Sequence, residues 1–530
     1  MKIEIVSGKV AVNSGCVGGK WLSSQEHGLV VIASQGVTFS ITNLANLTTI
    51  ERGTYPVPVG EEIFSGHVLS PATTGALQTA LLAVRQLFAD YGVDDYEVYA
   101  GQSFFEGENA EFVRDQLFNR TGMWVHRLAI PEEAYHRTSA VRQNFPHFDQ
   151  MIEDGTVLVD IGGGTVELIA FSNGTFSFAR NLNLGPLRVF EVMKDVQRSE
   201  PNYVEVLRDY IDSRLLDFMR LLPQKHDYQN MILTGSGMRL LGNMWPDDHQ
   251  GKIDRHHFRK LYHELTRASD QYIASTYDIA PAQVSQVLPT ILLIHQLVQR
   301  LDADAIWRSD LRLIDGLEVN AAVNADAHTV RFDPTESIRA SALTLSNWYH
   351  VDEKHRDTTV KFALQLFDRL RKLHGLGKRE RLLLETAALI TDIGSYIDTH
   401  DHAESSDYII RSSDIMGLSS REQAIVATIA HYHTSATPQL DMSALSTFNG
   451  ADRLIVAKLS ALLRVADSLD TSRQQKIDTI SVSMKSGRVT ITASSRDSLE
   501  LEKWTLAQKG HFFEAVFGMP VRLKWRNHQA

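Results

Sequence analysis

The twenty residues at 155–174, GTVLVDIGGGTVELIAFSNG, constrain the fold more than any other stretch of the chain. Residues 156–159 form a short β-branched and apolar run, which is typical of a buried strand. Three glycines follow at 162–164, and an extended pattern resumes at 166–171. Asn173-Gly174 is a strong signal for a hairpin turn. The stretch therefore predicts a strand, a glycine loop, a second strand and a tight turn.

The glycine loop predicts an anion-binding site. Glycine reaches backbone conformations that are closed to other residues, so the N–H groups of Gly162, Gly163, Gly164 and Thr165 can point at one anion. Asp160 precedes the loop and is placed to hold a metal ion beside that anion. A tight turn in which the glycines serve only packing is the alternative interpretation. The stretch is not a P-loop, because no Gly-Lys-Ser/Thr follows and the next element is a strand.

A second glycine turn lies at Gly235, Ser236 and Gly237, between a predicted strand at 231–233 and a predicted helix. Such a turn can receive a phosphate group at the start of the helix. Taken alone, this short pattern is weak support for a phosphate site.

Composition limits the class of protein. A chain of 530 residues is too long for one core, so several domains are expected. The formal net charge of −11 disfavours a general nucleic-acid binder but permits a local basic groove. The single cysteine, Cys16, excludes an intramolecular disulfide and fits a reducing cytoplasm. The strand-like residues 1–12 lack a signal-peptide core and no apolar run is long enough to span a membrane, so a cytoplasmic protein is predicted.

The periodicity predicts an α/β and α chain of four domains. Strand and helix patterns alternate through two α/β domains at 1–135 and 136–325. Residues 326–475 are helical throughout, which predicts a separate all-α domain. From residue 477 the period returns to two, which predicts a small α+β domain at 476–530.

Several motifs carry a family resemblance. VLVDIGGGTVELIAF resembles the Asp-Ile-Gly-Gly-Gly-Ser-Thr-Glu motif of the exopolyphosphatase and guanosine pentaphosphate phosphohydrolase (Ppx/GppA) family. Further segments resemble that family in the same order: PEEAY at 131–135, LNLGPLRVFE at 182–191, TGSGM at 234–238, VLPTILLIHQLV at 287–298, SDLRLIDGL at 309–317, AALITDIGSYI at 387–397 and LLRVADSLD at 462–470. The resemblance covers nearly the whole chain.

The resemblance implies two actin-like (sugar-kinase-like) domains with an active cleft between them. It also implies an HD-like helical domain and a small C-terminal domain. Members of the family remove the terminal phosphate from inorganic polyphosphate or from guanosine pentaphosphate, use Mg²⁺ or a similar divalent cation, and usually form homodimers. The expected partners are therefore one of these two phosphate compounds and a second copy of the chain, with no nucleic acid and no membrane.

The resemblance also assigns roles to particular residues. Glu133 matches the glutamate thought to act as the base on the attacking water, and its alternative role is that of a helix-start acid stabilised by the dipole. Asp160 and Glu167 are expected to hold the metal ion or its waters. The two glycine turns, at 162–165 and 235–237, are expected to bind phosphate from two sides.

Three departures from the family pattern bear on catalysis. The first phosphate loop of the family has an aspartate where this chain has Ala33, and two arginine positions hold Pro58 and Phe105. Each lost group can remove several kcal/mol of transition-state stabilisation. A non-catalytic sensor of polyphosphate or nucleotide with the same fold therefore stays open as an alternative.

The helical region poses a second question about metal binding. HD phosphohydrolases bind metal through His…His-Asp…Asp, and here His355, Thr391-Asp392 and Asp467 stand at those places. His402 and His433 also fall at family-like positions. Because one histidine ligand is missing, structural roles or polyanion contacts are favoured over metal binding.

The same region is locally basic. Its cations include Lys361, Arg371, Lys378 and Arg379, which could form a track for polyphosphate. The alternative is a solvated helix face in which these cations pair with acids such as Asp368 and Glu380.

Overall fold

The computed structural model describes residues 26–220, 228–244, 251–327, 330, 333, 335–434, 445–485 and 487–527. The chain divides into two compact units, Met1–Asp333 and Pro334–Ala530, which are described separately below. The strand expected at 1–12 and Cys16 lie outside the described residues.

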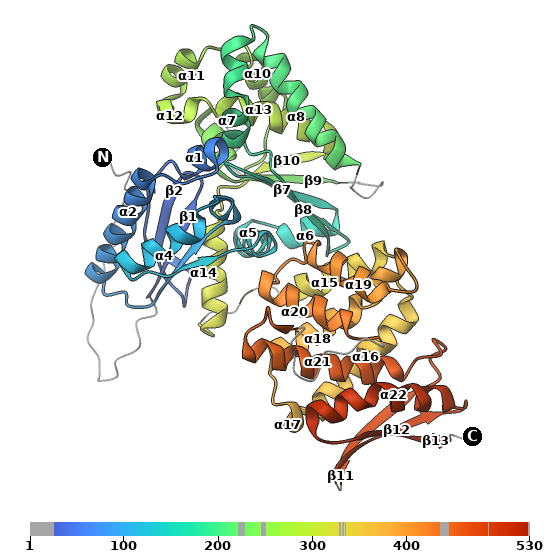
Figure 1. The fold of residues 1–530 in the computed structure, drawn as a ribbon. Coiled ribbons are helices and arrows are strands. Elements are labelled where there is room, and N and C mark those ends of the chain that lie inside the picture. Colours follow the sequence, from blue (N-terminus) through green and yellow to red (C-terminus); the bar gives the residue numbers. More distant parts are fainter. Residues whose placement is uncertain are drawn as a thin grey trace. The chain divides into compact units, whose positions relative to one another are not determined.

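The first sheet of the N-terminal unit has the order β3-β2-β1-β4-β5 (Figure 1). Strands β1 (Glu26–Ala33), β2 (Gly36–Asn43) and β3 (Thr48–Pro56) form an antiparallel meander. Strands β4 (Tyr96–Ala100) and β5 (Val125–Arg127) then add in parallel beside β1. Strand β5 is short, and helix α5 begins soon after it at Ile130, with Pro131 in its first turn.

The second sheet repeats this topology in the order β10-β9-β6-β7-β8. Its meander consists of β6 (Thr156–Ile161), β7 (Val166–Ser172) and β8 (Thr175–Leu182). Strands β9 (Asn230–Thr234) and β10 (Ala305–Arg308) are parallel to β6. Each sheet thus joins three hairpin strands to two parallel strands, which gives the two α/β lobes that the sequence predicts.

The hairpin between β7 and β8 forms as the sequence predicts. Asn173 and Gly174 both have positive φ, at 50° and 72°, as a two-residue turn between twisted strands requires. Strand β6 extends further than the sequence indicates: Asp160 and Ile161 belong to it, because each has a partner on β7.

Helices surround both sheets of this unit (Figure 1). They are α1 (Val59–Gly66), α2 (Pro71–Asp90), α3 (Gln102–Phe105), α4 (Ala110–Thr121), α5 (Ile130–Asn144), α6 (Phe148–Glu153), α7 (Pro186–Ser199), α8 (Tyr203–Met219), α9 (Ser236–Leu241), α10 (Arg255–Leu265), α11 (Asp270–Tyr277), α12 (Pro281–Val284), α13 (Val287–Leu301) and α14 (Leu313–Asn324).

Helices α5 and α14 pack against each other although they are far apart in the sequence. A Cβ atom at Gly316 of α14 would lie 1.7 Å from the carbonyl oxygen of His136 on α5, so only glycine permits this approach. Helix α14 also packs on the first sheet, where Ile314 and Leu317 join a core cluster with Leu29 and Val31. The last helix of this unit therefore completes the first lobe.

The C-terminal unit is built around one core. Its helices are α15 (Glu336–Trp348), α16 (Glu353–Arg369), α17 (Arg371–His374), α18 (Lys378–Ile390), α19 (His402–Arg411), α20 (Ser420–His431), α21 (Gly450–Ser468) and α22 (Glu500–Phe517), with the sheet β11 (Thr479–Lys485), β12 (Arg488–Ser495) and β13 (Val521–Asn527). Val489, Ile491 and Phe513 of the terminal segment belong to the same buried cluster as the helices. Helix α22 ends at Phe517, and Gly518 after it has a positive φ, as is common at the C-terminal cap of a helix.

None of the helices in the described part of the chain combines the length and the apolar character that crossing a membrane requires.

Candidate functional site

The acids that the sequence predicts lie together in the N-terminal unit. Asp160 on β6 is the register partner of Glu167 on β7, and both side chains are buried. Glu133 stands in the first turn of α5. Strands β6 and β9 are parallel neighbours, and Asp160 of β6 pairs with Thr234 of β9. The first glycine turn follows the carboxyl end of β6 and the second follows that of β9, so the two turns lie at the same edge of the sheet. In α/β sheets that edge is where ligands bind.

Arg137, which is not among the site residues predicted from the sequence, joins the three acids. Its guanidinium lies 2.8 Å from Asp160 Oδ2, 2.8 Å from Glu133 Oε2 and 3.0 Å from Glu167 Oε2. Burial lowers the pKa of Arg137, but the charges of Asp160, Glu133 and Glu167 outweigh that effect and raise it. Arg137 is therefore a fixed cation, held by three carboxylates through its planar fork of donors. Its position one helical turn after Glu133 is the only sequence signal for it.

The carboxylate of Glu133 is fixed on its other side by the first lobe. Its Oε1 accepts a hydrogen bond from the backbone N–H of Gln102, at 2.8 Å, just beyond strand β4. A Cβ atom at Gly101 would lie 2.8 Å from the same oxygen, so Gly101 leaves room for the acid. Glu133 thus touches both the first lobe and, through Arg137, the second sheet.

The start of helix α7 holds the glycine loop through hydrogen bonds to its carbonyl groups. The carbonyl of Gly163 accepts hydrogen bonds from the N–H groups of Leu187 and Arg188, and the carbonyl of Gly164 accepts from Gly185 N and Arg188 Nε. In the described part of the chain, the N–H groups of Gly163 and Gly164 donate no hydrogen bond. Since buried N–H groups are rarely left unpaired, these two donors are available to an anion.

Close packing also requires the glycines. A Cβ atom would lie 2.4 Å from Ser34 Oγ at Gly163 and 2.4 Å from Phe64 at Gly164. The packing interpretation and the anion-binding interpretation of the loop are therefore compatible.

The second glycine turn packs directly on the end of strand β6. Gly235 has a φ of 95°, and a Cβ atom there would lie 2.5 Å from the carbonyl oxygen of Ile161. Ser236 and Gly237 begin the short helix α9, which also carries the half-buried Arg239.

Arg239 is a cation that the sequence interpretation missed. Burial and the neighbouring charge of Arg312 lower the pKa of Arg239 to about 10, while Asp160 acts in the opposite direction. Neither arginine forms a side-chain ion pair with an acid among the residues that the structure describes. Two neighbouring cations without a paired acid favour an anion close to Asp160.

In the part of the first lobe that the structure describes, no comparable loop joins strands β1 and β2. Ala33 pairs with Gly36, so only Ser34 and Gln35 connect β1 to β2, whereas four residues connect β6 to β7. Phe105, at an arginine position of the family, lies under the guanidinium of Arg127, 5.0 Å from its ring centre. The loss of charge noted in the sequence is thus accompanied by a shorter loop.

The HD-like residues form a buried cluster in the C-terminal unit. His355 Nδ1 donates to Asp470 Oδ2 at 2.8 Å, and its Nε2 lies 3.3 Å from Asp467 Oδ1. Burial lowers the pKa of His355, but its hydrogen bonds to Asp467 and Asp470 raise it to about 9. Lys509 also pairs with Asp467. Cationic side chains therefore already neutralise this part of the cluster.

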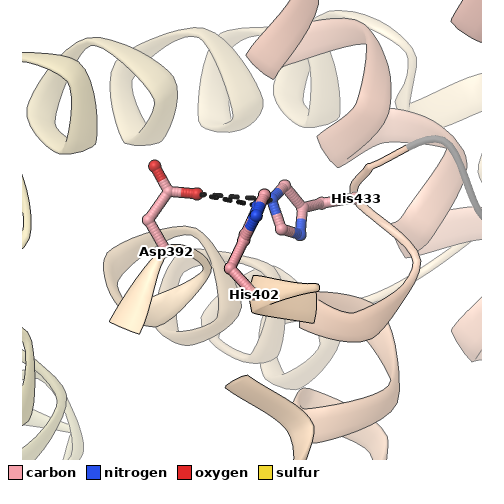
Figure 2. Close-up of side chains that lie close together, drawn as sticks. All are labelled: Asp392, His402 and His433. Atoms are coloured by element: carbon pink, nitrogen blue, oxygen red, sulfur yellow. Dashed lines mark hydrogen bonds and ion pairs between the residues drawn. The ribbon is translucent and has the colours of Figure 1, made fainter. Parts of the chain in front are cut away.

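His355 faces Oδ2 of Asp392, whereas two other histidines face its second oxygen, Oδ1. Asp392, His402 and His433 point toward one another, and their ligand atoms all lie within 4.8 Å of each other (Figure 2). Thr391, which stands at the position of the missing histidine ligand, is buried beside them.

One cation of the expected basic track, Arg379, is paired with an acid, and so is the nearby Arg381. Arg379 binds both oxygens of Glu422, at 2.6 and 2.7 Å, and Arg381 binds both oxygens of Asp368, at 2.9 Å. Lys361 donates to the carbonyl of Asp478 at 3.0 Å. Arg371 and Lys378 are exposed. These contacts support the solvated, paired helix face more than the polyphosphate track.

Comparison with known proteins gives a consistent match. The model of the Ppx/GppA phosphatase family matches residues 37–324, and that of Ppx/GppA phosphatase, domain III, matches residues 338–511. A protein of Vibrio vulnificus named guanosine-5'-triphosphate,3'-diphosphate pyrophosphatase is 22% identical over 353 residues, 64% of this chain and 66% of its own length. A Vibrio campbellii protein of the same name is 21% identical over 58% of this chain and 61% of its own length. The chain thus covers less than two thirds of these relatives.

Solved structures are similar over somewhat more than half of the chain. An exopolyphosphatase from Cytophaga hutchinsonii has a TM-score of 0.48 and 15% identity, covering 57% of this chain and all of its own. An Aquifex aeolicus member of the Ppx/GppA family has a TM-score of 0.47 and 13% identity, covering 57% of this chain and 98% of its own.

Proposed function

Because the chain belongs to the Ppx/GppA phosphatase family, we propose that it is a phosphohydrolase that releases the terminal phosphate of inorganic polyphosphate. The observation that carries this proposal is the convergence of Glu133, Asp160 and Glu167 on Arg137, next to the unpaired N–H groups of Gly163 and Gly164. This arrangement combines a candidate base, a cationic centre and an anion-binding loop.

In the proposed reaction a water molecule attacks the terminal phosphorus. Glu133 orients the water and takes its proton, the bond from phosphorus to the bridging oxygen breaks, and the shortened chain leaves with the electron pair of that bond. The N–H groups of Gly163 and Gly164, together with Arg239, would stabilise the charge of the transferred phosphate. Arg137 holds Glu133 in place for this role.

Mg²⁺ is the cofactor that we propose for this site. Oxygen ligands suit Mg²⁺, which needs only one or two carboxylates because it keeps several waters. Three carboxylates and one guanidinium have a formal net charge of −2, so the site fits a divalent cation. Asp160 and Glu167 would hold it, and when bound it would supply charge neutralisation to the phosphate.

Two alternatives rest on specific observations. Guanosine pentaphosphate is an alternative substrate, since the Vibrio relatives carry names of that activity. A non-catalytic sensor is favoured by the two-residue turn at Ser34 and Gln35, which replaces a first phosphate loop.

The polyphosphatase proposal and its two alternatives are tested by one experiment. It measures phosphate release from long-chain polyphosphate and from guanosine pentaphosphate, each with and without Mg²⁺. We expect Glu133→Gln to lower turnover by about 10²–10⁴ because it keeps the shape but removes the base. The matched control is Glu132→Gln, which changes the neighbouring acid that accepts a hydrogen bond from the backbone N–H of Ala129, and we expect little change in turnover.

The outcomes separate the alternatives. Faster phosphate release from guanosine pentaphosphate would favour the alternative substrate. Binding of either compound without turnover in the unaltered protein would favour the sensor. Equal activity of Glu133→Gln and the unaltered protein would exclude Glu133 as the base.

A further inference from the structure

The C-terminal unit brings two imidazoles and one carboxylate to a single point, although their positions in the sequence are far apart. Asp392 follows helix α18, His402 is the first residue of α19, and His433 lies just after α20. The distance from His402 Nε2 to His433 Nε2 is 3.2 Å, and those from Asp392 Oδ1 to His433 Nε2 and His402 Nε2 are 3.3 and 3.9 Å. Figure 2 shows the three side chains facing one another.

These distances match those between ligands of one metal ion. Ligand atoms about 2.0–2.1 Å from a tetrahedral Zn²⁺ ion are about 3.3 Å apart. Two of the three separations agree with that value, and the third is wider by about half an ångström.

The outer contacts orient the rings for coordination. His433 Nδ1 hydrogen-bonds to the carbonyl of Ala430, which leaves the lone pair of Nε2 directed into the cluster. His402 hydrogen-bonds to the backbone of Thr399. Histidines that bind metals characteristically donate their other ring N–H to an acceptor of this kind.

The carboxylate has one oxygen engaged and one available. Asp392 is 4% exposed, and its Oδ2 accepts from Arg473 at 2.7 Å. Its Oδ1 is buried and accepts no hydrogen bond of good geometry from the residues that the structure describes. A buried carboxylate oxygen with no such bond is costly unless a cation compensates it.

Backbone packing holds the segments that carry Asp392 and His402 together. A Cβ atom at Gly394 would lie 2.0 Å from the carbonyl oxygen of His402, so the turn after Asp392 touches the start of α19. Ser406 Oγ donates to Thr391 O at 2.8 Å and accepts from Gly394 N at 2.9 Å. Rigid support of this kind preorganises a metal site.

We propose that Asp392, His402 and His433 bind one divalent transition metal, of the Zn²⁺ type rather than Mg²⁺. Imidazole nitrogen is the preferred ligand of Zn²⁺ and similar ions, whereas Mg²⁺ prefers oxygen. Three protein ligands leave a position for water, as in catalytic zinc sites. This site is distinct in sequence and chemistry from the three carboxylates around Arg137, and it uses neither His355 nor Asp467.

The experiment uses the full chain, from which a chelator has removed any bound metal. The protein is titrated with Zn²⁺, and both the number of Zn²⁺ ions bound per chain and the melting temperature are measured. We expect one Zn²⁺ ion per chain and a higher melting temperature, since a ligand that binds only the folded state stabilises it. His402→Ala, His433→Ala and Asp392→Asn should each weaken binding by more than about 100-fold, because even the loss of outer-shell partners costs 10–100-fold.

His400→Ala is the matched control. His400 is exposed and stands two residues before His402, so its loss should leave Zn²⁺ binding unchanged. His402→Gln, which keeps a polar side chain, is the second variant should His402→Ala fail to fold. Failure of the unaltered, folded protein to bind Zn²⁺ would overturn the proposal, as would Zn²⁺ binding that survives in the folded ligand variants or tight binding of Mg²⁺ at these residues.

Discussion

Arg137 is the residue on which the charge balance of the candidate active site depends. Replacing it with methionine leaves three mostly buried carboxylates without their shared cation, and breaking a buried ion pair in this way costs about 3–5 kcal/mol. We expect Arg137→Met to lower the urea midpoint of unfolding accordingly. Arg198→Met is the control, because the Arg198–Asp195 pair is exposed and should change stability by less than about 0.5 kcal/mol. Equal midpoints for the two variants would contradict the central role of Arg137.

His136 predicts a pH dependence of stability. Burial lowers its pKa from 6.5 to about 4, so the folded protein keeps this ring neutral while the unfolded chain takes up a proton below pH 6.5. The contribution of His136 to the free energy of unfolding is fully present above pH 6.5. It is lost as the pH falls toward 4, and the total loss is about 3 kcal/mol. His136→Gln should therefore show a smaller loss of stability between pH 6.5 and 4 than the unaltered protein. Parallel unfolding curves at both pH values would contradict this.

At the scale of elements, the contact between helix α7 and the glycine loop positions the N–H groups that we propose bind the phosphate. A Cβ atom at Gly185 would lie 2.4 Å from both Gly164 C and Thr165 N, which are backbone atoms that cannot rotate away. We expect Gly185→Ala to displace the loop and to reduce phosphate release at least tenfold. Gly75→Ala is the control: this glycine of helix α2 has open space around it, and alanine there should stabilise the helix by up to about 1 kcal/mol. Full activity of Gly185→Ala would mean that the loop does not position the substrate.

At the scale of the whole molecule, we expect a homodimer, as the family resemblance implies. Sedimentation should give about twice the chain mass of 59.4 kDa at micromolar protein. Leu501 and Trp504, three residues apart on helix α22, are 45% and 64% exposed and offer an apolar surface for association. Trp504→Glu should then shift the protein toward the monomer. A single-chain mass for the unaltered protein would refute the dimer, and an unchanged mass for the variant would refute this surface.

The sequence by itself determined the strands and turns around residue 160, the α/β character of the first part, the helical character of the second, and the family. Those features follow from local periodicity, turn chemistry and motif spacing, which act over a few residues. Only the tertiary structure decided what surrounds each acid. Arg137 stands between Asp160 and Glu167 because helix α5 packs against the second sheet, and Asp392 meets His402 and His433 because three element ends converge. Such contacts depend on packing between segments that are distant along the chain, and no local pattern in one sequence encodes which side chains packing brings together.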